Sequence, residues 1–563
     1  MKISLKILTP LFSAFAALAF IATPFAPTLN AAYGSETKVA ATLAFASEDS
    51  IWKCAEQIGS ELNCAEVVRV LRPNIENSMK YLGAVDPSKQ FGIALAVNEN
   101  EVYPFGYIPL KSTETSDASA LEELKATIAK VPKVGEVEQV IKGSTLYICS
   151  PKFKDSLPTD KVMELAPREG ETLLLAFEAF PTTIPAEFLE ACFAVFRQKI
   201  AEQATKPNSV SVENLNSLMN HYSSIVNSME KVGFSIYVDS SNSLCLRCTT
   251  QAKPDTEFAK LLQDTKATQT HWNGIADTSN AIFSCVNAGK YMESLKSFQL
   301  DQLQNVACKN ALNQLDVLID DPKDFELAKE AIENLKAEAV AGLERGAFDN
   351  AIALGAAPLV LKLGVMIANP DGVKKILEVV VERLKKDVEN LDKFVTLNAE
   401  TIDGYDVTKV DIPVTEIVPK PFEYFKGKTL SARIGIGGET LAIVVGLDSS
   451  EVETEFAKVV SGSKGLQTCP TKTTFDVQQL AKVFRDIYSQ LDNVRPEALA
   501  SVNKVVETDN LKVIAEQSYG DNTYEGTLTI GGAFFKAIGN VIRINVQGVP
   551  DENDANDMDE LFE

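Results

Sequence analysis

The sequence predicts an α+β fold of two related halves, each with antiparallel β-hairpins and helices packed on one face of a sheet. Three observations lead to this prediction. The pentapeptide Thr-Glu-Phe-Ala-Lys occurs at 256–260 and again at 454–458, each time after a hairpin-like stretch. A second pattern, two strands, a helix and two strands, also occurs twice. The chain of 563 residues, with 45% hydrophobic and 23% charged residues, has a globular composition and is long enough for several domains.

The first copy of the pentapeptide closes a segment of strand, strand and helix. Apolar and polar residues alternate through 232–248, which is typical of strands with one buried face, and the polar run 239–242 predicts a turn between them. Pro254 and Asp255 favour a helix start. Phe258 then begins an apolar stripe at helical spacing, so we expect this helix to pack on the hairpin before it.

The second copy has the same surroundings. Residues 430–446 alternate in the same way around Gly437 and Gly438, which predict a hairpin turn. Ser450 and Glu453 have the spacing of a capping box at the start of the following helix. When the two copies are aligned without gaps, the apolar strand positions coincide, and this agreement indicates a structural repeat.

The second repeated pattern lies upstream of each hairpin. Residues 91–150 and 348–412 both read as two strands, a helix and two strands. We therefore predict a first half over 36–290 and a second half over 291–550. Each half is expected to be an antiparallel sheet with helices against one face.

The N-terminus is typical of a secretory signal peptide. Lys2 and Lys6 precede an apolar run, and small residues follow near Ala31 and Ala32, where we expect cleavage to remove residues 1–31. An uncleaved anchor is the alternative, although the run is shorter than the ~20 residues that span a bilayer. After cleavage the protein should not be integral to a membrane. It should be extracytoplasmic, in the periplasm, the cell envelope or the medium.

Two further segments have simple interpretations. The apolar stretch 352–368 is interrupted by a proline and a lysine, so it predicts buried strands rather than a membrane span. The C-terminal residues 551–563 include seven acidic residues and no basic one, which is typical of a disordered acidic tail. A calcium loop does not fit there, because the sixth and twelfth positions are Asn556 and Phe562 instead of Gly and Glu.

Charge and histidine content exclude several kinds of function. Acidic residues outnumber basic ones by 77 to 54, so the surface should repel phosphate backbones, and we expect no nucleic-acid partner. The two histidines, His221 and His271, leave few ways to build a histidine triad or a histidine-rich metal site.

The nine cysteines are sparse for an exported protein of this length. A disulfide between Cys54 and Cys64 is the pairing to test first, since it would close a short loop near the new N-terminus. Cys245 and Cys248 form a C-x-x-C motif, but they lie in a predicted strand. Residues three apart on a strand point to opposite faces, so no redox or zinc site is expected there.

No catalytic, cofactor or metal residue can be nominated. The glycine clusters at 433–440 and 528–540 fit neither a dinucleotide nor a P-loop pattern, and no G-x-S-x-G elbow occurs. His221 reads as a boundary residue of a helix. His271 and Trp272, in a polar loop, are a weak candidate for ligand binding, with a tryptophan that covers a core edge as the alternative.

A family resemblance adds to this interpretation. The exported start, "FGIALAVNENEVYPFGYIPLKS", "YICSPKFKDSLPTD" and "GFSIYVDSSNSLCLRCTTQAKPDTEFAKLL" resemble a group of large uncharacterised secreted proteins typical of planctomycete bacteria. The resemblance spans most of the mature chain, through hydrophobic patterns with scattered Gly, Pro and Phe. It implies an extracytoplasmic location and a repeated architecture, and it carries no catalytic residues.

The predicted function is that of a non-enzymatic, exported protein that binds a ligand or supports the cell envelope. One alternative is a hydrolase that uses two carboxylates, which should lie about 5 to 10 Å apart in a cleft. Another is a carrier of an apolar ligand, which should contain a continuous apolar cavity of several hundred Å³.

Overall fold

The structure, a computed structural model, describes residues 37–62, 64–98, 101–111, 118–130, 136–158, 165–191, 223–276, 280–291, 321–387, 391–417, 425–462, 467–468, 471–490 and 494–547, with residues 193, 194, 198, 220, 296, 299, 300, 308 and 311–313. The predicted signal peptide 1–31, the acidic tail 551–563 and His221 lie outside the described residues.

The described part of the chain forms two compact units. Unit 1 contains the described residues that fall within 1–202, 222–258 and 523–536, and unit 2 contains the described residues within 203–221, 259–522 and 537–563. The division falls within the helices α7 (Glu257–Lys266) and α17 (Gly532–Gln547). It differs from the predicted boundary at 290, because residues 259–290 belong to unit 2 and β20 (Thr523–Ile530) belongs to unit 1.

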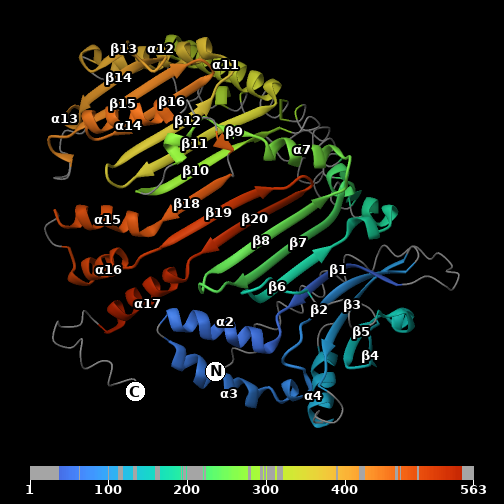
Figure 1. Ribbon diagram of the computed structural model, residues 1–563. Coiled ribbons are helices and arrows are strands. Elements are labelled where there is room, and N and C mark those ends of the chain that lie inside the picture. The colour runs from blue at the N-terminus through green and yellow to red at the C-terminus, as the bar shows by residue number, and fades with distance from the viewer. Residues whose placement is uncertain are drawn as a thin grey trace. The chain divides into compact units, whose positions relative to one another are not determined.

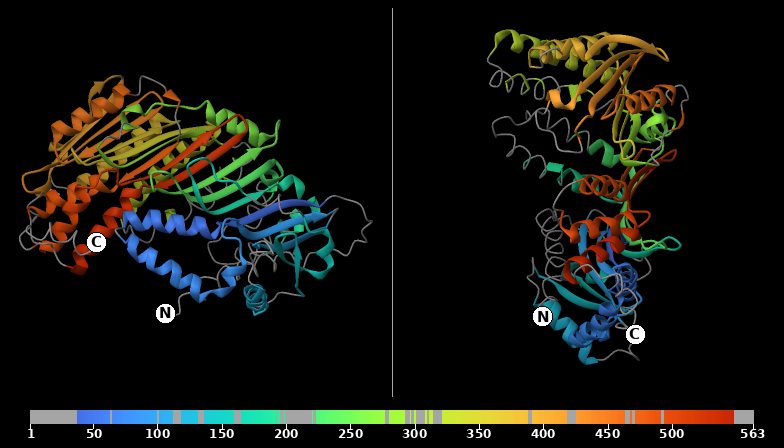
Figure 2. Two further views of the ribbon diagram at one scale, coloured as in Figure 1. Left: turned by 60° about the horizontal axis from the view of Figure 1, so that its bottom comes forward. Right: turned by 90° about the vertical axis from the view of Figure 1, so that its left-hand side faces the viewer.

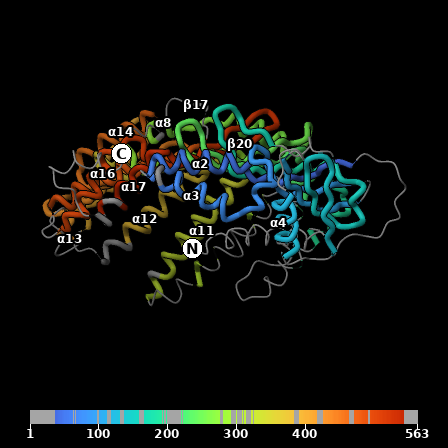
Figure 3. The backbone as a smooth tube through the Cα atoms, turned by 90° about the horizontal axis from the view of Figure 1, so that it is seen from below, coloured from blue at the N-terminus to red at the C-terminus, as the bar shows by residue number. Residues whose placement is uncertain are grey.

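Unit 1 contains one antiparallel sheet (Figure 1). The strands pair in the order β4-β5-β3-β2-β1-β6-β7-β8-β20. Their bounds are β1 Lys38–Phe45, β2 Phe91–Asn98, β3 Glu101–Pro109, β4 Glu138–Lys142, β5 Thr145–Cys149, β6 Thr172–Ala179, β7 Met229–Val238, β8 Leu244–Ala252 and β20 Thr523–Ile530. The helices α2 (Glu48–Glu61) and α3 (Ala65–Ser78) pack against each other (Figure 3), and α4 spans Ala118–Ala129.

Residues on both faces of the β3–β5 region of unit 1 are buried. Tyr103, Phe105 and Tyr147 lie in one core cluster. Leu146 and Ile148 alternate with them along β5 and pack instead with the buried residues of α4, which recur at every fourth position (Ala120, Leu124 and Ile128). This spacing places all three on one helix face.

The strands of unit 2 are also antiparallel. The strands pair in the order β13-β14-β15-β16-β12-β11-β10-β18-β19. Their bounds are β10 Ala281–Lys290, β11 Ala347–Gly355, β12 Val360–Met366, β13 Val395–Ile402, β14 Tyr405–Pro413, β15 Thr429–Gly437, β16 Thr440–Gly446, β18 Lys472–Asp476 and β19 Lys512–Tyr519, and β9 (Gln269–Thr270) pairs separately with β17 (Gln467–Thr468). The helices are α8 Asn273–Ala276, α11 Pro322–Arg345, α12 Pro370–Asp387, α13 Val414–Ile417, α14 Ser449–Gly462, α15 Val477–Tyr488 and α16 Pro496–Val506.

Helices cover both faces of the unit 2 sheet, which corrects the prediction of one covered face (Figure 2). Tyr405 and Val407 of β14 lie in the core cluster with Phe456 of α14. Asp406, between them, points to the other face and pairs with Lys374 of α12 at 3.0 Å. The alternation of the sequence did not reveal the second layer.

The second copy of the pentapeptide has the predicted structural role, since α14 packs on β15 and β16. The hairpins β7–β8 and β15–β16 precede α7 and α14, as predicted. Phe456 is fully buried and Lys458 is exposed, while Phe258 is half-buried and Lys260 is exposed. Gly438, with φ of 56°, forms the tight turn of the second hairpin.

The pattern of two strands, a helix and two strands is confirmed in both places. The strands of this pattern pair differently in the two units. In unit 1, β5 pairs directly with β3. In unit 2, the hairpin β15–β16 lies between β14 and β12. The two hairpins that precede the pentapeptide therefore occupy different positions in their sheets.

The described cysteines are free thiols, so the disulfide predicted between Cys54 and Cys64 is not formed in the structure. The Cys54 thiol on α2 points toward β6 and donates to the carbonyl oxygen of Thr172, with Sγ 3.6 Å from that oxygen. Cys64 is the residue that precedes α3. On β8, Cys245 is buried and Cys248 exposed, which confirms that the two face opposite ways.

Candidate functional site

Two adjoining hollows lie at one end of the unit 2 sheet. Pro358, in the turn between β11 and β12, lines both of them. The smaller hollow has a volume of about 210 Å³ and the larger about 610 Å³. We refer to the pair as the divided cleft.

The smaller hollow exists because the residues around it are small. Its lining includes Gly274, Ala281, Ala353, Gly355 and Ala357, with Asn280, Pro358 and Val360. Charged residues complete the wall. Lys362 is the cross-strand partner of Ala353, so it emerges on the same sheet face, and Glu455 and Lys458 come from α14.

The three charged residues form an ion-pair cluster. The Glu455 side chain is only 9% exposed and pairs through Oε2 with Nζ of Lys362, which is 14% exposed. Its Oε1 accepts from Nζ of Lys458 at 2.6 Å. Burial opposes ionisation of Glu455, but the hydrogen bonds and charges of the two lysines outweigh it and lower the pKa of this carboxyl. The cluster therefore carries one surplus positive charge.

The larger hollow surrounds the start of α14. Asp448 accepts hydrogen bonds from the backbone N–H groups of Ser450 at 2.9 Å and Glu451 at 3.0 Å. Its carboxylate also accepts from the Ser450 hydroxyl at 2.7 Å, and these contacts lower its pKa. The cap is therefore Asp448, which corrects the capping box predicted from Ser450 and Glu453.

A buried arginine supports this end of the helix. Arg433 of β15 donates through Nη2 to the Ser449 hydroxyl at 2.7 Å and through Nη1 to Asp411 at 3.1 Å. Burial opposes ionisation of Asp411, but the hydrogen bond and the charge of Arg433 contribute to a net lowering of the pKa of this carboxyl. These contacts join β14, β15 and the first residue of α14, and thereby fix the wall of the larger hollow.

His271 and Trp272, the residues predicted from sequence for binding, lie elsewhere in unit 2. Trp272 is fully buried in the core and donates from Nε1 to the carbonyl oxygen of Asp349 at 3.2 Å. The His271 side chain is 31% exposed, and its Nδ1 lies 2.9 Å from a carboxylate oxygen of Asp349. Asp349 also accepts from the Thr270 hydroxyl at 2.8 Å. The structure brings the two residues together through Asp349, and the enclosed tryptophan ring is packed as part of the core.

Unit 1 contains a separate charged cluster. Arg247 of β8 pairs with Glu171, donates to the Tyr237 hydroxyl at 2.7 Å and lies 3.5 Å from Glu525. Arg168 makes two contacts to Glu525, at 3.1 and 2.6 Å. Burial raises the pKa of Tyr237 to about 12. The two arginines are balanced by two glutamates, so the cluster is suited to joining the strands rather than to binding an ion.

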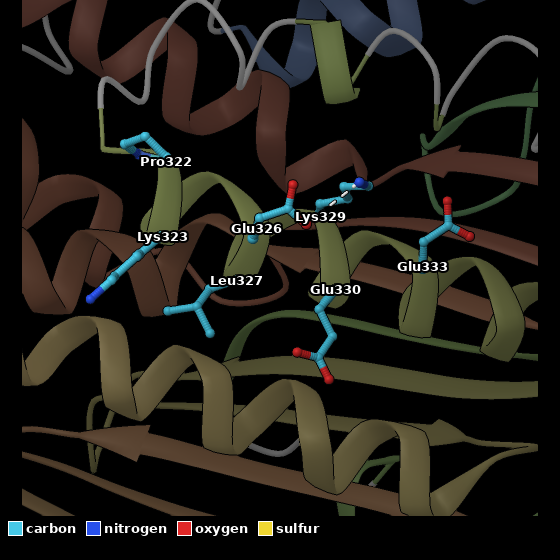
Figure 4. A pocket seen from close by; sticks show the side chains of 7 residues that line it. All are labelled: Pro322, Lys323, Glu326, Leu327, Lys329, Glu330 and Glu333. Carbon is cyan, nitrogen blue, oxygen red and sulfur yellow. Dashed lines mark hydrogen bonds and ion pairs between the residues drawn. The ribbon is translucent and has the colours of Figure 1, made fainter.

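A third hollow, of about 760 Å³, runs along α11 (Figure 4). Its described lining comes from one helix, residues Pro322, Lys323, Glu326, Leu327, Lys329, Glu330 and Glu333. Lys329 pairs with Glu326 one turn away, and no second element contributes to the described wall. It therefore lacks the converging groups that make a site.

No sequence pattern predicted the charged wall of the divided cleft. Glu455 and Lys458 lie within the second pentapeptide copy, and Lys362 is far away in sequence. Only the pairing of β12 and the packing of α14 bring them together.

Comparison with known proteins does not extend this description. No family model matches the chain, and no curated protein or solved structure matches it significantly. Within the described part of the chain, no helix is both long and apolar enough to cross a membrane. The same residues include no group of three His, Cys, Asp or Glu side chains arranged to hold a metal ion.

Proposed function

We propose that this chain is an exported, non-enzymatic binding protein whose ligand occupies the divided cleft. The observation that carries the proposal is the charged wall of the smaller hollow. Glu455 and Lys362 are almost enclosed there. A buried ion pair costs desolvation energy that an apolar pair would avoid, so its presence beside an open volume indicates a role in binding.

The polar lining of the cleft favours binding over hydrolysis. A carboxylate hydrolase needs a general acid whose pKa is raised. Asp448 and Glu455 line the two hollows, and both have lowered pKa values because they accept hydrogen bonds in their ionised forms. Each carboxylate is suited to accept hydrogen bonds in its ionised form, and neither is suited to act as a general acid.

The same lining disfavours the carrier of an apolar ligand. The larger hollow is lined in part by Lys428, Asp448, Ser450 and Glu451. The smaller one, at about 210 Å³, is below the ~300–1,000 Å³ of typical pockets for drug-sized ligands. A lipid chain would therefore meet charged groups in both.

Blocking the smaller hollow tests the proposal. Ala357 lines it and is exposed, so Ala357→Trp should cover the opening without burying the new ring. The exposed Ala337 on α11 is a matched control. The full chain is recovered from its source, and native mass spectrometry compares what co-purifies with each variant. We expect Ala357→Trp to lose the ligand and Ala337→Trp to keep it. Equal retention by both variants would refute the proposed site.

Export rests on the N-terminal sequence and on the resemblance to secreted planctomycete proteins. The experiment is fractionation of the source cells followed by N-terminal sequencing of the recovered protein. A chain that begins after Ala31 or Ala32 outside the cytoplasm supports export with cleavage. A cytoplasmic chain that begins at Met1 would exclude it.

We also propose that units 1 and 2 derive from one ancestral unit. In support, β3-β2-β1-β6-β7 of unit 1 and β12-β11-β10-β18-β19 of unit 2 pair in corresponding orders, and helical segments follow β3 and β12. Superposing unit 1 on unit 2 should match these strands with their buried positions in register. A shift by one residue would turn buried residues outward and would argue against common descent.

A further inference from the structure

We propose that the smaller hollow of the divided cleft binds a small anionic group, a carboxylate or a phosphate, at Lys458, beside the enclosed pair of Lys362 and Glu455. This inference rests on the proposed function and specifies the chemistry of its ligand. The wall of the smaller hollow carries a net positive charge, because two lysines pair with a single glutamate.

The geometry leaves Lys458 available to a ligand. Lys362 and Glu455 are enclosed and neutralise each other, whereas the Lys458 side chain is 62% exposed. Lys458 reaches Glu455 from the same helix, three residues along, and this kind of surface pair contributes little to stability. The Lys458 ammonium group can therefore turn toward an anion at little cost to the stability of the fold.

The surroundings suit a small anion in particular. The volume of about 210 Å³ admits roughly seven water-sized groups. Asn280 lines the same hollow and carries a side-chain amide that can donate a hydrogen bond. An anion here would cancel the surplus positive charge in a partly enclosed site, where charge-assisted hydrogen bonds are stronger than in water.

The two copies of the pentapeptide provide a matched pair of variants. Lys458 and Lys260 occupy the same position in the repeated sequence, each three residues after a glutamate, and both are exposed. Lys260 does not line the hollow. Lys260→Gln therefore controls for the loss of one surface charge.

The experiment is a calorimetric titration of the full chain with acetate and, separately, with inorganic phosphate. Lys458→Gln should weaken binding of the preferred anion by about 10-fold or more, the effect of one hydrogen bond to a charged group. Glu455→Gln removes the competing negative charge and should tighten binding. Lys260→Gln should leave it unchanged. The anion that binds the wild-type chain more tightly identifies the ligand as a carboxylate or a phosphate.

Several results would overturn the inference. One is a wild-type chain that binds neither anion at about 10 mM, well above a millimolar Kd. Another is equal weakening by Lys458→Gln and Lys260→Gln. If either occurs while Ala357→Trp still displaces the co-purifying ligand, the anionic class is wrong and the cleft remains the site. If Ala357→Trp displaces nothing, the proposed function fails as well.

Discussion

Replacing Phe456 by Ala should destabilise unit 2 by about 3–5 kcal/mol, the cost of removing a fully buried phenylalanine. Phe456 is 0% exposed and belongs to the core cluster that also contains Trp272 and Val444. Phe258, its counterpart in the first pentapeptide copy, is only half-buried. Phe258→Ala should therefore cost about half as much, since the stabilisation scales with the apolar area buried.

The two tryptophans make the assay selective. Trp52 lies in unit 1, and Trp272 lies in the same core cluster as Phe456. In a Trp52→Phe background, urea unfolding followed by tryptophan fluorescence reports on unit 2 and therefore on Phe456→Ala. In a Trp272→Phe background the same measurement reports on unit 1, which contains Phe258. The midpoint and slope then give the free energy of unfolding for each variant. Circular dichroism should confirm that the folded variants keep their secondary structure.

A glycine under the ring provides an internal check. A Cβ at Gly435 would lie 2.5 Å from Cζ of Phe456 and 3.2 Å from Cβ of Tyr405. Gly435→Ala should therefore cost about 1–3 kcal/mol in the wild-type core. It should cost much less beside Phe456→Ala, because the methyl group would enter the vacated space. The reasoning is refuted if the cost of Gly435→Ala is the same in both backgrounds, or if Phe456→Ala costs no more than Phe258→Ala.

Three further predictions concern charge and thiol chemistry. The folded-state pKa of Glu455 is lowered, so its contribution to stability is complete above the unfolded value of about 4.3 and is lost as the pH falls through the lower folded value. Unfolding measured from pH 6 down to about pH 3 should show this loss, and Glu455→Gln should flatten it. Burial raises the pKa of Cys54 to about 11, so iodoacetamide should label the exposed Cys248 first and reach Cys54 only on unfolding, as peptide mass mapping would show. Glu171→Gln should cost about 3 kcal/mol or more by stranding a buried arginine. Arg168→Gln should cost under about 1 kcal/mol, because that side chain is half-exposed. Thermal unfolding of unit 1 compares the two, and equal costs would contradict the difference in burial.

Local pattern predicted the local elements well. The alternation of 232–248 gave the hairpin β7–β8, and Gly437 with Gly438 gave the turn of β15–β16, because a hairpin is encoded by residues that are neighbours in sequence. The separation of Cys245 from Cys248 followed from strand geometry alone.

The pairing of strands that are distant in sequence could not be predicted from local patterns. Whether β12 pairs with β14 or with β16 depends on contacts between segments about 50 to 80 residues apart, for which periodicity has no signal. The second helical layer was missed for a related reason. β12 carries apolar residues on both faces, and such a strand reads as a continuous apolar run whichever elements cover it.

The same limit explains why neither of the residues nominated from sequence lines the divided cleft. His271 and Trp272 attracted notice because their residue types are rare in this chain, yet the tryptophan is core. Glu455 and Lys458 were not nominated as binding residues, because the first pentapeptide copy carries the same two residue types. The lysine is exposed in both copies, and the phenylalanine is fully buried in the second copy and half-buried in the first. What distinguishes the second copy is Lys362 of β12, which pairs with Glu455 beside a hollow left by small residues. The second pentapeptide thus forms a packing element, and the binding role that we propose for it depends on the charge that a distant strand supplies.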